Sequence, residues 1–138
     1  MGTWGTGTLE NDSAQDFFAV IFEINFKSLK FFFSKERFLL ANINSVLENT
    51  DFYQETIAAC EAIAAAHGKA NPQLNEDYIQ ISLKCKNRID NKIVTKAIIF
   101  LNEIEKDEEA LDGWLSEESK VEWLNNISDL KKRLKSIS

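Results

Sequence analysis

Residues 13–33 read SAQDFFAVIFEINFKSLKFFF and hold seven of the ten phenylalanines of the chain. One apolar stripe repeats here at spacings of four, four, three and four: Phe18, Phe22, Phe26, Leu29 and Phe33. This spacing places side chains on one face of an α-helix. A second stripe is formed by Phe17, Ile21 and Ile24, and two apolar faces indicate a largely buried helix. We therefore expect a helix over 13–30 in the middle of the core.

Residues 22–27 leave an alternative open. Their sequence, FEINFK, alternates apolar and polar side chains as a half-buried strand would. The helical spacing on both sides of the segment favours the helix.

Six further helical patterns follow, separated by residues typical of helix ends. Ser34, Asp107 and Ser116 can each cap a helix start, and Gly68 is a natural stop. Between Ser34 and residue 67, the segment 49–51 (Asn-Thr-Asp) breaks one helix and caps the next. The remaining apolar stripes cover residues 34–47, 52–67, 74–85, 93–104, 111–115 and 121–137. The chain is therefore expected to be one all-α domain over 1–138, an irregular arrangement of about six helices with residues 1–11 as an ordered loop packed on it.

Composition excludes several classes of protein. The chain has 138 residues, of which 44% are hydrophobic and 28% charged, the balance of a globular domain. A net charge of −6 argues against nonspecific binding of nucleic acid. The longest apolar run, residues 17–22, is far too short to span a membrane. With no secretory pattern at its start, we expect a cytoplasmic protein that binds neither membrane nor nucleic acid.

The glycine-rich opening permits two interpretations. Backbone amides before a helix start can hold an anion, and a ligand pocket could be formed by Trp4, Gly5, Gly7, Asn11 and Asp12, with Trp114. No lysine-containing phosphate-loop motif or dinucleotide fingerprint is present, however. Capping alone explains an Asn and an Asp here, so we favour a structural loop around Trp4.

Thiol and imidazole chemistry has few candidates. Two cysteines, Cys60 and Cys85, and one histidine, His67, are too few for a four-ligand structural zinc site. Cys60 and His67 share a helix face and could form a nucleophile–base pair, but no third, orienting group is apparent. We favour core roles for both cysteines and a helix-end role for His67, and we expect no metal, no cofactor and no catalytic residue.

Charge is concentrated in one part of the chain. Residues 103–122 hold nine acids against two lysines, so this segment carries −7 and the rest of the chain +1. No calcium-loop spacing is present. The acids either form a solvated face or attract a basic protein, with Glu105, Glu108 and Glu109 as the contact residues.

Two other surface features have structural and functional interpretations. Lys84, Arg88, Lys92 and Lys96 stand four apart, but a break expected at 87–90 would split this basic stripe. Phe31, Phe32 and Phe33 lie at a helix junction. They are either buried there or exposed as a patch for a partner or a second copy of the chain.

Residues 1–7, MGTWGTG, and 10–17, ENDSAQDF, resemble the signature of an uncharacterised, mainly bacterial family catalogued as domain of unknown function 4259. Its members open with Trp-Gly-x-Gly and continue with Asn-Asp-x-Ala-x-Asp and an aromatic, usually Trp, where this chain has Phe17. Residues 59–68 resemble the family's middle. Its carboxyl-terminal pattern is echoed by Leu111, Trp114, Trp123, Leu130, Arg133 and Leu134. The resemblance implies a compact, mostly helical domain and carries no established reaction or cofactor.

The sequence thus favours a non-catalytic cytoplasmic protein-binding domain. One form of it is an acidic inhibitor of the immunity or antitoxin type. The alternatives are an enzyme or small-ligand protein with a pocket near the glycine-rich loop, and a structural domain that self-associates through residues 31–33.

Overall fold

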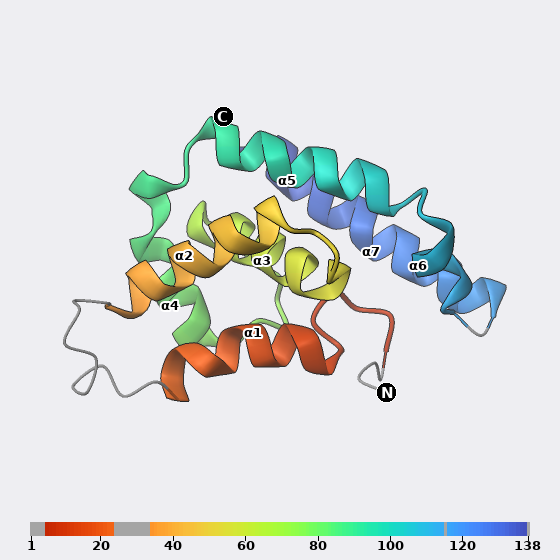
Figure 1. Ribbon diagram of the computed structural model, residues 1–138, viewed down its shortest axis with the longest axis horizontal. Helices are drawn as coiled ribbons and strands as arrows, with labels where there is room; N and C mark the ends of the chain where they lie inside the picture. Colours follow the sequence, from red (N-terminus) through yellow and green to blue (C-terminus); the bar gives the residue numbers. More distant parts are fainter. Residues whose placement is uncertain (1–4, 24–33, 115, 138) are drawn as a thin grey trace.

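The computed structural model describes residues 5–23, 34–114 and 116–137. Within these ranges the chain forms seven α-helices, one 3₁₀ turn and no strand (Figure 1). The elements are α1 (Asp12–Glu23), α2 (Lys35–Glu48), α3 (Tyr53–Ala66), α4 (Glu76–Lys84), η1 (Lys86–Arg88), α5 (Asn91–Ile104), α6 (Glu108–Asp112) and α7 (Glu117–Lys135). The expected all-α class is confirmed.

Helix α3 occupies the centre of the fold. Every residue from Thr56 to Ala66 is buried, and α1, α2, α4, α5 and α7 all pack against the helix (Figure 1). Its six alanines allow neighbouring backbones to approach from several sides, since a methyl group adds little to the helix radius. The sequence predicts the middle of the core in residues 17–33, and most of these side chains lie outside those that the structure describes. Phe17 and Phe18 are buried, on a helix that is one of five packed around α3.

Helix α1 confirms the helical interpretation as far as Glu23. The rest of the 22–27 segment, the expected continuation to residue 30 and the Phe31–Phe33 triplet lie outside the described residues. Phe18 anchors α1 by stacking on Tyr78 of α4, with ring centroids 5.1 Å apart.

The helix ends show which capping predictions are right. Ser34, Asp107 and Ser116 each accept a hydrogen bond from a backbone amide of the first turn. Gly68 adopts φ +79°, and the amide that follows it, of Lys69, bonds the Ala64 carbonyl at 2.8 Å, which is a Schellman ending.

The capping role expected at residues 49–51 is wrong. Phe52 stands at the start of α3 and makes no side-chain cap. Instead the hydroxyl of Thr56, one turn into α3, bonds the Phe52 and Val46 carbonyl oxygens at 3.3 and 3.4 Å. A residue within α3, rather than one that precedes it, thus stabilises the turn between α2 and α3.

Helices α5 and α7 lie side by side on one side of α3, and α1 lies on the other (Figure 1). The short α6 links the far ends of α5 and α7 (Figure 1). Trp123 of α7 is buried at this end and contacts the rings of Tyr53 and Trp114. No helix in the described ranges has the length and apolarity needed to cross a bilayer.

Candidate functional site

A fully buried carboxylate, Glu61, lies at the centre of the molecule. Arg133 of α7 approaches it with both terminal nitrogens, Nη1 to Oε1 at 2.7 Å and Nη2 to Oε2 at 3.2 Å. Oε2 also accepts hydrogen bonds from the Thr8 hydroxyl and, at 3.0 Å, from the Asn71 amide. We call these four residues the Glu61 cluster. It satisfies a buried charge that would otherwise be very costly.

Arg133 joins the Glu61 cluster to the surface. Its guanidinium also donates to Asp129 at 2.9 Å and to the Lys69 carbonyl oxygen at 3.0 Å. Burial lowers the pKa of Arg133, but the hydrogen bonds and charges of Glu61 and Asp129 outweigh burial and raise it above its ordinary value. Arg133 therefore stays positively charged at neutral pH.

The glycine-rich loop is bound to the domain at several points. The Gly7 amide donates to the Glu10 carboxylate at 3.1 Å, and the Thr6 carbonyl oxygen accepts from Asn126 of α7 at 2.8 Å. The Glu10 carboxylate lies where a β-carbon on Gly5 or Gly7 would stand. Both glycines thus leave room for the Glu10 carboxylate, and this carboxylate already binds the Gly7 amide that an anion-site interpretation would offer to a ligand.

The two polar residues after the loop have different roles. Asn11 is buried, and its side-chain oxygen accepts from the Ala14 amide at 2.7 Å, while its nitrogen donates to the Thr8 carbonyl oxygen at 3.3 Å. Asn11 therefore caps α1 and fixes the loop residue that binds Glu61. Asp12 is exposed in the first turn of α1.

Trp114 is not grouped with the glycine-rich loop. Its ring lies 6.0 Å from that of Trp123, and it lines a small cavity of about 60 Å³ with Tyr53, Gln54, Ala110 and Gly113. Trp4 lies outside the described residues. Of the other proposed pocket residues, Gly5, Gly7 and Asn11 are engaged in contacts of the loop, and Asp12 is exposed on α1.

The thiols and the imidazole are in structural settings. Cys60 and Cys85 are both buried. Burial raises the pKa of both thiols, that of Cys85 to about 11, so neither is a thiolate at neutral pH. His67 follows α3, and its Nε2 lies 3.2 Å from the Ile89 carbonyl oxygen. Within the described ranges, no group of three His, Cys, Asp or Glu side chains could hold a metal ion.

The acid-rich segment forms an exposed surface around α6 and the start of α7. Five exposed carboxylates, on α6 and in the first turn of α7, define what we call the acidic surface: Glu108, Glu109, Asp112, Glu117 and Glu118. Glu105 differs from these because it is half-buried and bound to Lys131 at 2.8 Å. The acidic surface therefore includes two of the three contact residues expected from the sequence.

A sequence model described as "Domain of unknown function (DUF4259)" matches residues 2–126. The chain belongs to this family. No curated protein and no solved structure matches the chain. The matched range includes the glycine-rich loop, Asn11, Glu61 and Asn71, whereas Arg133 lies after it.

Sequence reasoning missed the Glu61 cluster, although one signal for it was present. Glu61 is the single charged residue among the alanines and apolar residues of positions 56–66. A carboxylate on a helix with no polar face must be paired inside the protein. Its partners could not be named, because Thr8 and Arg133 are 53 and 72 positions away.

Proposed function

We propose that this DUF4259 domain is a non-catalytic module that binds a basic protein through its acidic surface. An inhibitor of the immunity or antitoxin type, which blocks a basic partner, is one form that such a module takes. The observation that supports the proposal is that the five carboxylates are exposed and have few ion-pair partners within the described part of the domain. All five are exposed, and among the five only Glu117 forms an ion pair with a described residue, with Lys120 at 3.1 Å.

An exposed apolar side chain within this surface adds a second property of an interface. Val121 is 52% exposed and lies one helical turn beyond Glu117 and Glu118, on the same face of α7. An apolar contact surrounded by charge is typical of protein interfaces, in which charges steer the encounter and apolar area stabilises the complex.

The setting of the family signature also favours binding over catalysis. Asn11 and the loop glycines make intramolecular contacts, and Thr8 satisfies Glu61. These contacts stabilise the fold, and that role explains the signature residues that the structure describes. The α6 end, in contrast, presents charged groups with few internal partners.

Charge reversal tests the proposal. The tagged chain is used to capture partners from lysate of its natural host, and a basic protein retained in one-to-one ratio is expected. Its affinity for purified wild type is then compared with that for the triple variant Glu108→Lys, Glu109→Lys and Asp112→Lys. We expect at least a tenfold loss, and a smaller difference at high salt because exposed charges are screened.

A matched control makes the same charge change elsewhere. Asp16, Glu48 and Asp51 are exposed acids outside the acidic surface, and changing them to Lys should leave affinity within about threefold. Equal loss in both triple variants would show that only net charge matters and would overturn the assignment of the surface. Failure to retain any basic protein would overturn the binding function itself.

A further inference from the structure

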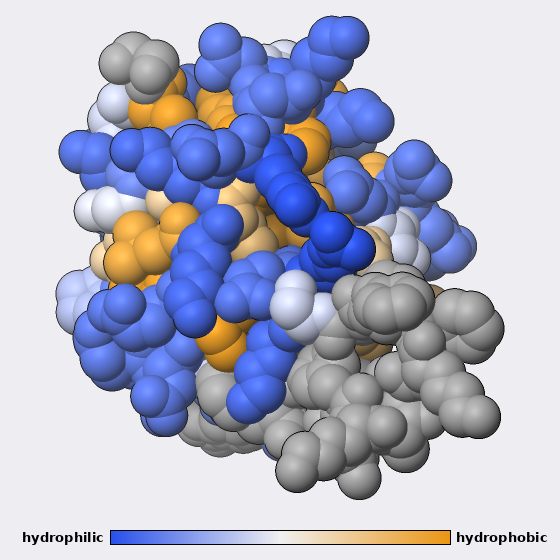
Figure 2. All heavy atoms as spheres, turned by 90° about the vertical axis from the view of Figure 1, so that its left-hand side faces the viewer, coloured by the Kyte–Doolittle hydropathy of each residue, from blue (hydrophilic) through white to orange (hydrophobic). Residues whose placement is uncertain are grey.

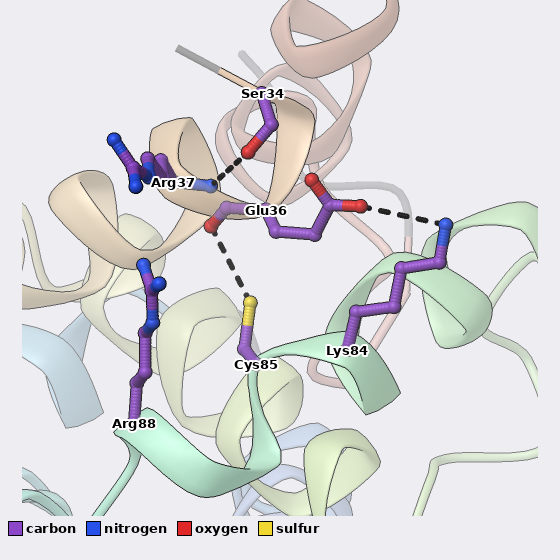
Figure 3. A pocket seen from close by; sticks show the side chains of 6 residues that line it. All are labelled: Ser34, Glu36, Arg37, Lys84, Cys85 and Arg88. Atoms are coloured by element: carbon purple, nitrogen blue, oxygen red, sulfur yellow. Dashed lines mark hydrogen bonds and ion pairs between the residues drawn. The ribbon is translucent and has the colours of Figure 1, made fainter. Parts of the chain in front are cut away.

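A pocket of about 230 Å³ lies at the opposite, basic end of the domain, between the start of α2 and the α4–η1 junction. Six residues line it: Ser34, Glu36, Arg37, Lys84, Cys85 and Arg88 (Figure 3). Figure 2 faces this end of the molecule and shows strongly hydrophilic side chains gathered there. The volume is several times the roughly 30 Å³ of one water in the liquid.

The charges in this pocket are unbalanced. Lys84 is paired with Glu36 at 3.4 Å, and in Figure 3 the Glu36 carboxylate turns toward Lys84. Hydrogen bonds from its own backbone amide and from Ser34 lower the pKa of Glu36, and it is therefore ionised at neutral pH. This pair is neutral overall, so the two arginines determine the net charge of the pocket.

Arg37 and Arg88 are the uncompensated groups. They come from α2 and from η1, and Figure 3 shows both guanidinium groups on the side of the pocket away from the Glu36 carboxylate. Both are exposed, and no ion pair joins either guanidinium to a described residue. Two like charges on facing elements repel each other, and an anion between them removes that cost.

The floor of the pocket is closed and uncharged. The Cys85 thiol donates to the Glu36 carbonyl oxygen at 3.4 Å, and burial raises its pKa to about 11. The Arg37 amide is already bound to the Ser34 hydroxyl at 3.3 Å. The arginine side chains, rather than the end of α2, are thus the groups available to a ligand.

We propose that this pocket binds a phosphate group, held between Arg37 and Arg88. A guanidinium offers two parallel N–H donors that match phosphate oxygens, and two guanidinium groups balance a phosphate dianion. The site is independent of the acidic surface because the two lie at opposite ends of the domain (Figure 1). It can be tested whether or not a protein partner is found.

The test is calorimetric titration of the full chain with inorganic phosphate and with adenosine monophosphate, in a low-salt buffer free of phosphate. We expect one site for each compound and no binding of adenosine. The Arg37→Gln, Arg88→Gln double variant should weaken binding at least tenfold. Equal affinity for both compounds would identify free phosphate as sufficient, and tighter binding of the ester would identify a phosphorylated organic molecule.

The control variant is Lys92→Gln, Lys96→Gln, which removes the same charge from exposed positions on α5. Its affinity should stay within about threefold of wild type. Amide NMR shifts on the wild type, expected at Arg37, Lys84 and Arg88, give a readout that needs no variant. Absence of heat and of shifts with millimolar phosphate, or equal weakening in both double variants, would overturn the proposal.

Discussion

Replacing Glu61 by Gln tests whether the Glu61 cluster holds the domain together. The two side chains have nearly the same shape, so the substitution removes charge without leaving a cavity. The donors that face Glu61 come from Thr8, Asn71 and Arg133. Gln offers them one oxygen and places an NH₂ group, itself a donor, against the rest.

The expected cost follows from these contacts. Breaking a buried ion pair by neutralising one partner costs about 3–5 kcal/mol, because the other charge is left buried. Arg133 exposes only 16% of its side chain, so water replaces little of what is lost. A domain of this size loses roughly 3–5 °C in Tm per kcal/mol, so Glu61→Gln should lower Tm by roughly 10–25 °C.

The assay is urea unfolding followed by far-ultraviolet circular dichroism, with the free energy of unfolding obtained by linear extrapolation. The matched control is Asp129→Asn, which removes the exposed ion pair of the same arginine and should cost less than about 1 kcal/mol. If Glu61→Gln costs no more than Asp129→Asn, the cluster contributes little to stability and the reasoning is refuted.

Three smaller predictions use the same measurement. Gly68→Ala should cost about 1–2 kcal/mol because its φ of +79° strains an L side chain, whereas Gly113→Ala, with helical φ and room for a methyl group, should be near neutral. Asn11→Ala should cost about 1–2 kcal/mol through loss of the α1 cap, and Asp12→Ala less than about 1 kcal/mol; equal losses would contradict the capping role. Since the Cys85 thiol stays protonated to about pH 11 when folded but ionises near 9 when unfolded, the free energy of unfolding should fall between pH 9 and 11. Cys85→Ala should flatten that fall, and unchanged slopes would show that the thiol is accessible to water.

The helices were predictable because their signals are local. The stripe of α7, with Trp123, Ile127, Leu130 and Leu134 at spacings of four, three and four, is buried along its length. Capping residues such as Ser34 act on an amide three residues away, which is within reach of sequence reasoning. Helix period and caps therefore gave most boundaries to within a few residues.

The centre of the core was harder to predict because burial depends on distant parts of the chain. Residues 13–33 are the most aromatic stretch, but bulky side chains fill space around a core as readily as at its middle. Helix α3 is central because its alanines let several helices meet, a property of shape rather than of hydrophobicity. The Glu61 cluster and the Arg37–Arg88 pocket join residues more than 50 positions apart, which local spacing does not reveal.

The ties between the glycine-rich loop and α7 also set an order of events during synthesis. Thr6 bonds Asn126 across 120 positions, and Glu61 bonds Arg133 across 72. Because α7 is made last among the described helices, these two contacts form only after the rest of the described chain has been made. Until then, Glu61 has no cation to pair with its charge. A nascent chain that stops before α7 should therefore stay less compact and more sensitive to proteases than one that includes α7.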